Sequence, residues 1–114
     1  MITLYGIKNC DSVKKAQKFF KEHAIDVAFV DFRENPVEPS KVANWAKQSD
    51  LSKPFNNRSR TYKDLGLAKE NLEDTDKISW MQKEPLLIKR PVIEYGDQLI
   101  VGFDASKYKE VFKV

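Results

Sequence analysis

The chain has 114 residues, of which 41% are hydrophobic and 32% charged, and its 20 basic and 17 acidic side chains give a net charge of +3. This size and composition are typical of one globular domain with a single core, and they exclude a disordered or fibrous protein. The small net charge predicts no direct binding to nucleic acid. The N-terminal residues do not resemble a signal peptide, no run approaches ~18 apolar residues, and the one cysteine can form no internal disulfide. We therefore expect a cytoplasmic protein with no membrane partner.

The first part of the chain predicts a β-α-β unit. Residues 2–5 have the apolar content of a short buried strand, and from Asp11 the apolar side chains recur with the spacing of a helix that ends near residue 22 or 23. Residues 27–32 are apolar enough for a strand buried on both faces, which predicts parallel pairing through a right-handed crossover. The only histidine, His23, is expected at the helix C-terminus. It would lie about 20 Å from Cys10 along the helix, too far for a Cys-His pair.

Cys10, the only cysteine, falls at the junction of the first strand and the first helix. At or beside a helix N-cap, the first-turn amides, here those of Ser12 and Val13, and the positive end of the helix dipole favour an anion such as a thiolate. A lone cysteine is most often an inert buried side chain. The polar, turn-forming neighbours Asn9, Asp11 and Ser12 instead favour a reactive thiol here.

The middle of the chain, about residues 35–85, predicts an inserted helical subdomain broken by prolines and by a polar loop at 56–60. Its expected helices are one that begins at Pro39 or Ser40, a single turn at 62–67 closed by Gly66, and one that has Asp74 or Thr75 as its N-cap and ends before Pro85.

The C-terminal residues return to strand and then to helix. Residues 91–95 and 98–101 flank Gly96-Asp97, which suits a type II′ hairpin turn, and Asp104 is the expected N-cap of a final helix. The predicted class is therefore α/β, in the order β-α-β, helical insertion, β-β-α. This is a thioredoxin-like fold with a four-stranded mixed sheet and one domain over 1–114, whose core is 1–34 and 86–114.

Four motifs give the chain a resemblance to the arsenate reductase (ArsC)-like family, and within it to the YffB branch, which is related to the Spx regulators. The motifs are residues 5–12 (Tyr5-Gly6-Ile7-Lys8-Asn9-Cys10-Asp11-Ser12), 62–67, 85–91 and 101–103. The resemblance implies that Cys10 is a nucleophile and that Arg90 binds an anionic substrate or stabilises the thiolate. It also implies that Pro91 is a cis-proline beside the cysteine, where backbone is presented to an extended thiol ligand.

The resemblance implies a second site arginine, for which Arg58 is the better match and Arg60 the neighbour with which it can be confused. By its sequence context alone, Arg58 is a solvated loop residue. Asn9 and Ser12 complete the predicted site as neighbours of the thiol, and Lys8 is a further candidate. No metal and no bound cofactor are predicted.

The sequence departs from its family at positions that bear on the substrate. Residues 99–103 read Leu-Ile-Val-Gly-Phe where arsenate reductases have a third arginine, and residues 11–13 read Asp-Ser-Val where they have Gly-Thr-Ser. The oxyanion pocket is therefore incomplete. Spx-type regulators act by binding RNA polymerase and commonly carry a Cys-x-x-Cys redox switch, which Val13 excludes here.

The resemblance, with these departures, implies a glutathione-dependent monothiol thiol-disulfide reductase. Cys10 would form a mixed disulfide, and glutathione or another small thiol would have to resolve it because the chain has no second cysteine. Arg58, Arg90 and Lys8 would bind the carboxylates of glutathione, and disulfide-containing proteins are further candidate substrates. One alternative is an arsenate reductase with an incomplete arginine triad. Another is a Spx-like module that binds RNA polymerase or another protein through the basic face of the first helix, although a solvated face explains those lysines equally well.

Overall fold

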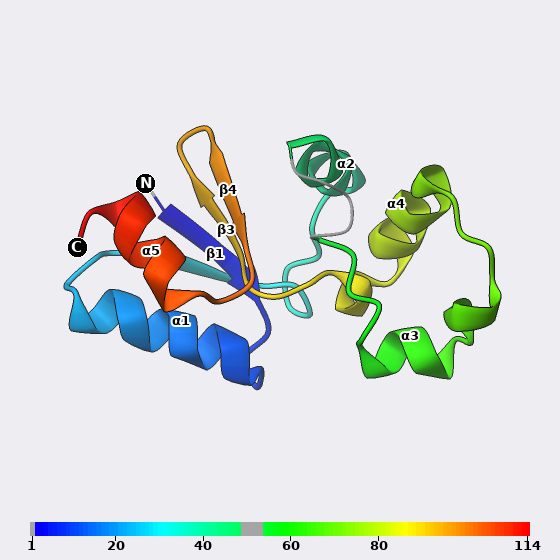
Figure 1. Ribbon diagram of the computed structural model, residues 1–114, viewed down its shortest axis with the longest axis horizontal. Coiled ribbons are helices and arrows are strands. Elements are labelled where there is room, and N and C mark those ends of the chain that lie inside the picture. The colour runs from blue at the N-terminus through cyan, green and yellow to red at the C-terminus, as the bar shows by residue number, and fades with distance from the viewer. Residues whose placement is uncertain (1, 49–53) are drawn as a thin grey trace. The chain divides into compact units, whose positions relative to one another are not determined.

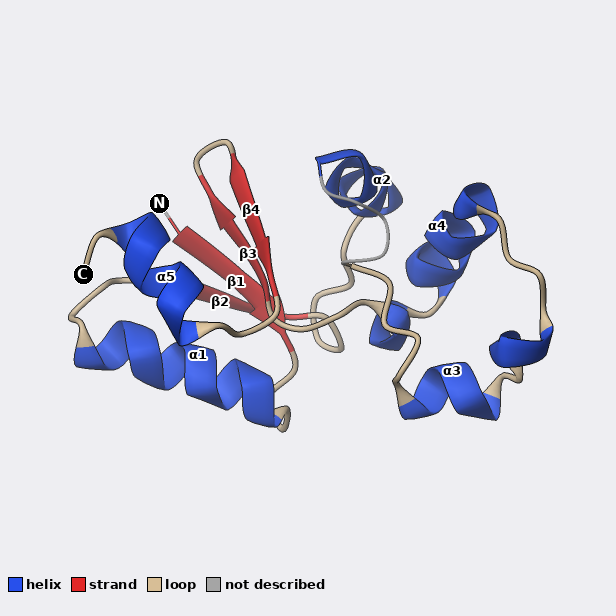
Figure 2. Ribbon diagram, in the orientation of Figure 1, coloured by secondary structure: helices blue, strands red, loops and turns tan. Residues whose placement is uncertain are grey.

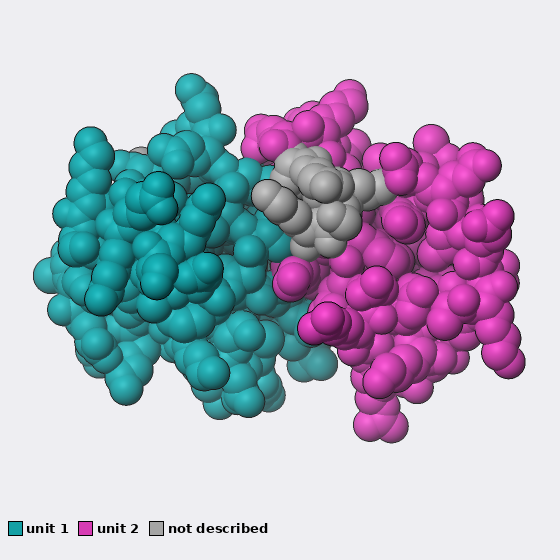
Figure 3. Space-filling model, in the orientation of Figure 1, with its two compact units in different colours: residues 1–35, 90–114 teal, residues 36–89 magenta. Residues whose placement is uncertain are grey.

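A computed structural model of the protein describes residues 2–48 and 54–114, which form two units (Figure 3). The first unit joins residues 1–35 to residues 90–114, and the second comprises residues 36–89. The second unit thus corresponds to the predicted helical insertion, with boundaries at 35/36 and 89/90 where the sequence predicted about 34/35 and 85/86. None of the described helices is both long and apolar enough to cross a membrane.

The first unit is built on a four-stranded mixed sheet, as predicted (Figure 2). Its strands are β1 (Ile2–Gly6), β2 (Ala28–Asp31), β3 (Val92–Tyr95) and β4 (Gln98–Val101), in the order β2-β1-β3-β4. β1 pairs with β2 in parallel, and the other pairs are antiparallel. Helix α1 (Asp11–Glu22) makes the crossover from β1 to β2, which a parallel pair requires.

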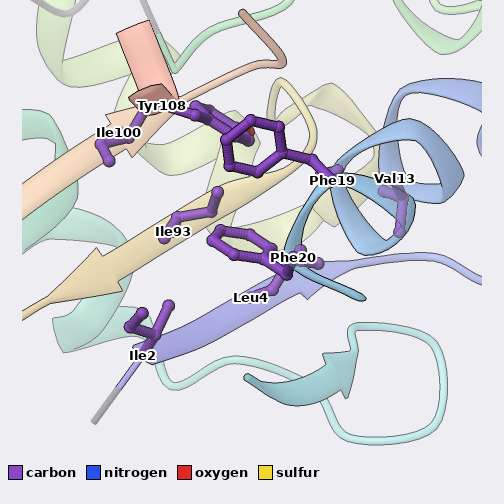
Figure 4. Packing of buried hydrophobic residues seen from close by; sticks show 9 residues of the cluster. Ile2, Leu4, Val13, Phe19, Phe20, Ile93, Ile100 and Tyr108 are labelled. Atoms are coloured by element: carbon purple, nitrogen blue, oxygen red, sulfur yellow. The ribbon is translucent and has the colours of Figure 1, made fainter. Parts of the chain in front are cut away.

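The core of this unit lies on one face of the sheet. Leu4, Ile93 and Ile100 are opposite one another on neighbouring strands, so their side chains share a face. Helices α1 and α5 (Ala105–Phe112) cover that face (Figure 1), and Phe20 and Tyr108 from the two helices stack at 5.7 Å between ring centroids (Figure 4). Burial of each such side chain contributes about 1.5–3 kcal/mol, so this face anchors both helices to the sheet.

The prediction that the second strand is buried on both faces is wrong. β2 is an edge strand, with Ala28 exposed and Phe29 and Val30 only half-buried. An apolar run alone cannot show whether a strand has one neighbour or two, and β2 has only β1 beside it. The predicted parallel pairing is confirmed, with Thr3 opposite Ala28.

The C-terminal elements follow the sequence prediction. Gly96 has φ 56°, a conformation that favours glycine, at the first position of the turn that joins β3 to β4. Asp104 is the N-cap of α5 and accepts the N–H of Lys107 at 3.2 Å. Cap and apolar spacing together place Tyr108 on the buried side of the helix.

The second unit contains α2 (Pro39–Gln48), α3 (Arg60–Asp64) and α4 (Asp74–Lys83), with 3₁₀ turns at Leu67–Lys69 and Pro85–Leu87. α2 packs against α4, and Trp45 and Met81 are almost fully buried. Gly66, at φ 67°, ends the turn that follows α3, as expected. The predicted N-cap of α4, Asp74 or Thr75, is wrong by at least one residue. Glu73 is the N-cap, because Asp76, three residues later, accepts its backbone N–H at 3.0 Å.

Candidate active site

The loops that carry the predicted site residues of the first unit meet at one edge of the sheet. β1 and β2 both end there, with Gly6 beside Asp31, and β3 begins there, with Val92 beside Tyr5. Cys10 follows β1, whereas Arg90 and Pro91 immediately precede β3. The strand register therefore brings two segments 80 residues apart in the chain to the same end of the sheet. We call this end, where β1 and β2 finish and β3 begins, the cysteine edge.

Cys10 is the N-cap of α1. Its backbone is extended, at φ −93° and ψ 125°, and its carbonyl accepts the first helical hydrogen bond, from Lys14 N–H at 3.0 Å. The side chain is half-buried against the core and makes no capping hydrogen bond. The sulfur is therefore held at the positive end of the helix without being used to close it, and the side chain is partly accessible.

A glycine at the end of β1 allows α1 to begin so close to the sheet. A Cβ atom added to Gly6 would lie 2.5 Å from Cγ2 of Val13, which is fully buried in the first turn of α1. Carbon atoms that are not bonded to each other do not approach so closely, so any side chain at position 6 would push the first turn of α1 away from β1. The close contact therefore fixes where Cys10 lies relative to the sheet.

The loop between β1 and Cys10 is fixed by a buried carboxylate that the sequence did not reveal. Asp31 is 5% exposed, and its two oxygens accept the backbone N–H groups of Lys8 at 3.2 Å and Arg33 at 2.8 Å. The neighbouring Phe32 N–H donates to the carbonyl of Gly6 at 2.9 Å. A lone acidic residue at the end of an apolar strand was the available signal, but its partner could be identified only from the parallel register.

Lys8, Asn9 and Ser12 lie on the Cys10 loop or the first turn of α1. Lys8 Nζ donates to Glu34 at 2.7 Å on an exposed surface, and this hydrogen bond raises the pKa of Lys8. The positive charge of Lys8 is therefore shared with a carboxylate, which reduces its effect on the thiol. Asn9 is exposed and Ser12 is half-buried.

The Arg90–Pro91 peptide bond is cis, as the family resemblance implied. Pro91 is buried, and its carbonyl accepts the N–H of Gly102 at 2.8 Å. The carbonyl of Gly102 in turn accepts the hydroxyl of Tyr108 at 2.6 Å, and burial raises the pKa of that hydroxyl well above its usual range. Two hydrogen bonds thus connect α5 to the proline at the cysteine edge, where Arg90 is half-buried.

The other two predicted arginines belong to the second unit. Arg58 is exposed, and its backbone N–H donates to Asn56 Oδ1 at 3.1 Å. Arg60 is also exposed and begins α3, where its Nε lies 3.6 Å from the Asp64 carboxylate. Roles for Arg58 and Arg60 in binding a thiol ligand stay predictions. His23 ends α1 as expected, and its Nδ1 donates to the carbonyl of Phe19 at 2.9 Å.

The strand order, the cysteine at the N-cap of the first helix and the cis-proline at the same sheet edge define a thioredoxin-like domain with a single redox-capable thiol. The ArsC family model matches residues 5–111, and the chain belongs to this family.

Relatives and solved structures agree with that assignment. A protein of Haemophilus influenzae is 35% identical over 98% of this chain and 99% of its own length. The global transcriptional regulator Spx of Streptococcus pyogenes is 28% identical, over 96% of this chain and 83% of its own. Among solved structures, the YFFB (PA3664) protein has a TM-score of 0.90 at 32% identity, with 96% of this chain and 97% of that chain covered. An arsenate reductase (ArsC) related protein from Brucella melitensis has 0.78 at 31% identity, with 99% and 95% covered.

Proposed function

We propose that this protein is a monothiol oxidoreductase that reduces disulfides with glutathione, with Cys10 as its nucleophile. The observation that carries the proposal is the position of Cys10, which is half-buried at the N-cap of α1 and makes no capping hydrogen bond. Membership of the ArsC family and the resemblance to an arsenate reductase related protein support thiol chemistry at this position.

The reaction has two steps. The Cys10 thiolate attacks one sulfur of a mixed disulfide between glutathione and a substrate thiol, a Cys10–glutathione disulfide forms, and the substrate leaves as its thiolate. A second glutathione thiolate then attacks the glutathione sulfur of that intermediate, which releases glutathione disulfide and restores the Cys10 thiolate. The net reaction consumes one mixed disulfide and one free glutathione, and it releases the substrate thiol and one glutathione disulfide. The resolving thiol must come from outside because Cys10 is the only cysteine in the chain.

Glutathione carries two carboxylates, and guanidinium groups bind carboxylates through paired donors. Arg90 is the first candidate to bind one of them, since it directly precedes Pro91 at the cysteine edge. Arg58 or Arg60 would supply the second contact. Lys8 is a weaker candidate than the arginines, because Glu34 already accepts a hydrogen bond from its ammonium group.

Two measurements test this function. Reduced protein is mixed with glutathione disulfide, and intact mass spectrometry should find one glutathione on wild type and none on Cys10→Ser. Reduction of a glutathionylated peptide is then followed with glutathione and with 2-mercaptoethanol, a thiol without carboxylates. We expect turnover to require Cys10 and to be much faster with glutathione. Equal turnover with both thiols would refute glutathione specificity, and an adduct that forms without turnover would refute the catalytic role.

A second candidate function is a protein-interaction module of the Spx type, which the 28% identity to the Streptococcus pyogenes regulator favours. Capture of partners from lysate by wild type and by Cys10→Ser separates the two functions. Partners held equally by both variants would favour docking, whereas partners that only wild type holds, through a reducible bond, would favour the oxidoreductase. We do not propose arsenate reduction as the main activity, because residues 99–103 contain no arginine. Robust arsenite formation with glutathione and glutaredoxin would reverse that ranking.

A further inference from the structure

A groove of about 480 Å³ lies between α1 and α5, along the part of α1 that leads away from Cys10. It extends from Lys15 to His23, eight residues of helix or about 12 Å. Its near end is five residues beyond Cys10, about 8 Å along the helix axis. The groove is thus separate from the thiol but near enough for one bound chain to reach both.

Aromatic rings form the floor of the groove. Phe19 is only 7% exposed, and Phe103 is half-buried. Both rings meet Tyr108 edge-on, at 5.4 Å and 5.3 Å between centroids, and Figure 4 shows Phe19 beside Tyr108. Tyr108 is fully buried and bonded to Gly102, so the floor is already ordered. A ligand would therefore gain apolar contact, mainly with the half-buried Phe103, without the cost of ordering these side chains.

Lysines dominate the rim of the groove. Lys15, Lys18 and Lys109 line it and are exposed, against a single carboxylate, that of Glu22. Glu22 lies 3.8 Å from Lys18 and offsets part of its charge. Within residues 2–48 and 54–114, Lys15 and Lys109 have no carboxylate within ion-pair distance. The rim therefore favours a negatively charged ligand.

We propose that this groove docks an acidic segment of a partner protein, with carboxylates on the lysine rim and one apolar side chain on the aromatic floor. An extended chain rises about 3.3 Å per residue, so the 12 Å groove fits about four residues. Single-stranded nucleic acid fits less well, because bases stack on exposed ring faces. The face of Phe19 is largely covered, with the His23 ring tilted over it at 4.2 Å.

The docked segment gives the proposed oxidoreductase a substrate class. Acidic residues that flank a glutathionylated cysteine would hold that cysteine about 8 Å from the groove, beside Cys10. This assignment of the segment to the substrate rests on the proposed function, whereas the docking itself does not. Binding is therefore measured first in a variant that cannot form a disulfide.

The binding experiment uses Cys10→Ser and a labelled six-residue peptide with glutamates around one leucine, compared with the same peptide in which glutamine replaces each glutamate. At low salt we expect the rim variant, Lys15→Gln/Lys18→Gln/Lys109→Gln, to weaken binding of the acidic peptide about tenfold, because three exposed positive charges are lost. The matched control Lys47→Gln/Lys63→Gln/Lys69→Gln removes equal charge from exposed residues of the second unit and should change affinity less than about twofold. Binding should weaken as salt shortens the Debye length to about 10 Å at 0.1 M.

Three results would overturn the docking groove: equal affinity for the acidic and neutral peptides, equal loss in both triple variants, or tighter binding of an oligothymidine that competes with the peptide. The substrate assignment is tested in wild type with glutathionylated peptides of both kinds. The rim variant should lose the preference for the acidic peptide and keep its rate with the neutral one. Binding without any turnover would refute the oxidoreductase and leave the groove, whereas turnover without preference would refute the assignment of the docked segment to the substrate and leave the oxidoreductase.

Discussion

Replacement of Gly6 by alanine tests how closely α1 must approach the sheet. The new Cβ would lie 2.5 Å from Val13 Cγ2, whereas carbon atoms prefer about 3.5–4.0 Å, so the two elements must separate by about 1 Å. Val13 is fully buried, with 0% of its surface exposed, and its branched side chain has little rotational freedom. Overpacking of this kind costs about 1–3 kcal/mol, partly offset by the lower chain entropy of alanine in the unfolded state. We expect a net loss of about 1–2 kcal/mol.

A second substitution isolates the clash. Val13→Ala removes both γ carbons and by itself should cost about 2 kcal/mol, through lost burial and a small cavity. In Gly6→Ala/Val13→Ala the added methyl occupies space that Val13 has vacated, so the double variant should be about as stable as Val13→Ala. The cycle should therefore give a favourable coupling of about 1–2 kcal/mol.

The assay is urea unfolding followed by far-ultraviolet circular dichroism, together with the rate at which iodoacetamide alkylates Cys10. Gly6→Ala should be less stable and should alter the alkylation rate, because the first turn of α1 moves, and the double variant should restore the rate toward wild type. Additive effects within about 0.5 kcal/mol would refute the reasoning. Gly6→Ala with wild-type stability and an unchanged alkylation rate would do the same.

Three further predictions concern Arg90, Asp31 and Tyr108, which lie at the cysteine edge or form the hydrogen bonds that order it. Arg90→Ala should slow alkylation of Cys10 at pH 7 by up to about tenfold, equivalent to 1.4 kcal/mol, and Arg90→Lys should slow it less; an unchanged rate in folded Arg90→Ala would remove Arg90 from the site. Asp31→Asn should cost about 2 kcal/mol in urea unfolding and speed amide exchange at Lys8, because the two backbone donors use different carboxylate oxygens and asparagine would replace one of these oxygens with an NH2 donor. Equal stability of Asp31→Asn would contradict that role. Tyr108→Phe should be about 1 kcal/mol less stable than wild type at pH 7. Burial raises the pKa of Tyr108 in the folded protein, so the stability that its hydroxyl contributes is complete below pH 10, the ordinary pKa being about 10, and is lost as the pH rises further. The difference in stability between wild type and Tyr108→Phe should therefore narrow above about pH 10. A constant difference would contradict the reasoning.

Local patterns predicted much of the first unit because its elements begin and end at residues with clear local preferences. The strand-to-helix change before Asp11 placed Cys10 at the N-cap, and Asp104 was correctly expected to begin α5. Gly96 marked the hairpin for the same reason, since a positive φ suits glycine. Each of these assignments depends on neighbours within four residues, and a single sequence contains that information.

Properties that depend on distant partners were missed. β2 was expected to be buried on both faces, but the number of neighbouring strands is set by the whole sheet. The role of Asp31 depends on a parallel register that brings Gly6 and Lys8 beside it from more than twenty residues away. The pairing of Lys8 with Glu34 likewise joins two loops, and it leaves less of the Lys8 charge for the glutathione carboxylates that the sequence analysis had assigned to it. Such contacts cannot be inferred from periodicity or capping.

The two proposed sites lie toward opposite ends of α1, and helix physics gives each of them a different requirement. At the N-terminus, Cys10 lies where backbone amides point toward an anion, so reactivity depends on the helix itself and on the contacts that fix its first turn, above all that of Val13 with Gly6. Toward the C-terminus the dipole has the opposite sign, and an anionic ligand there needs side-chain cations to be attracted. Lys15 and Lys18 supply that charge along the groove. Substitutions on the rim should therefore change which partner binds, while the thiol keeps its reactivity toward small reagents.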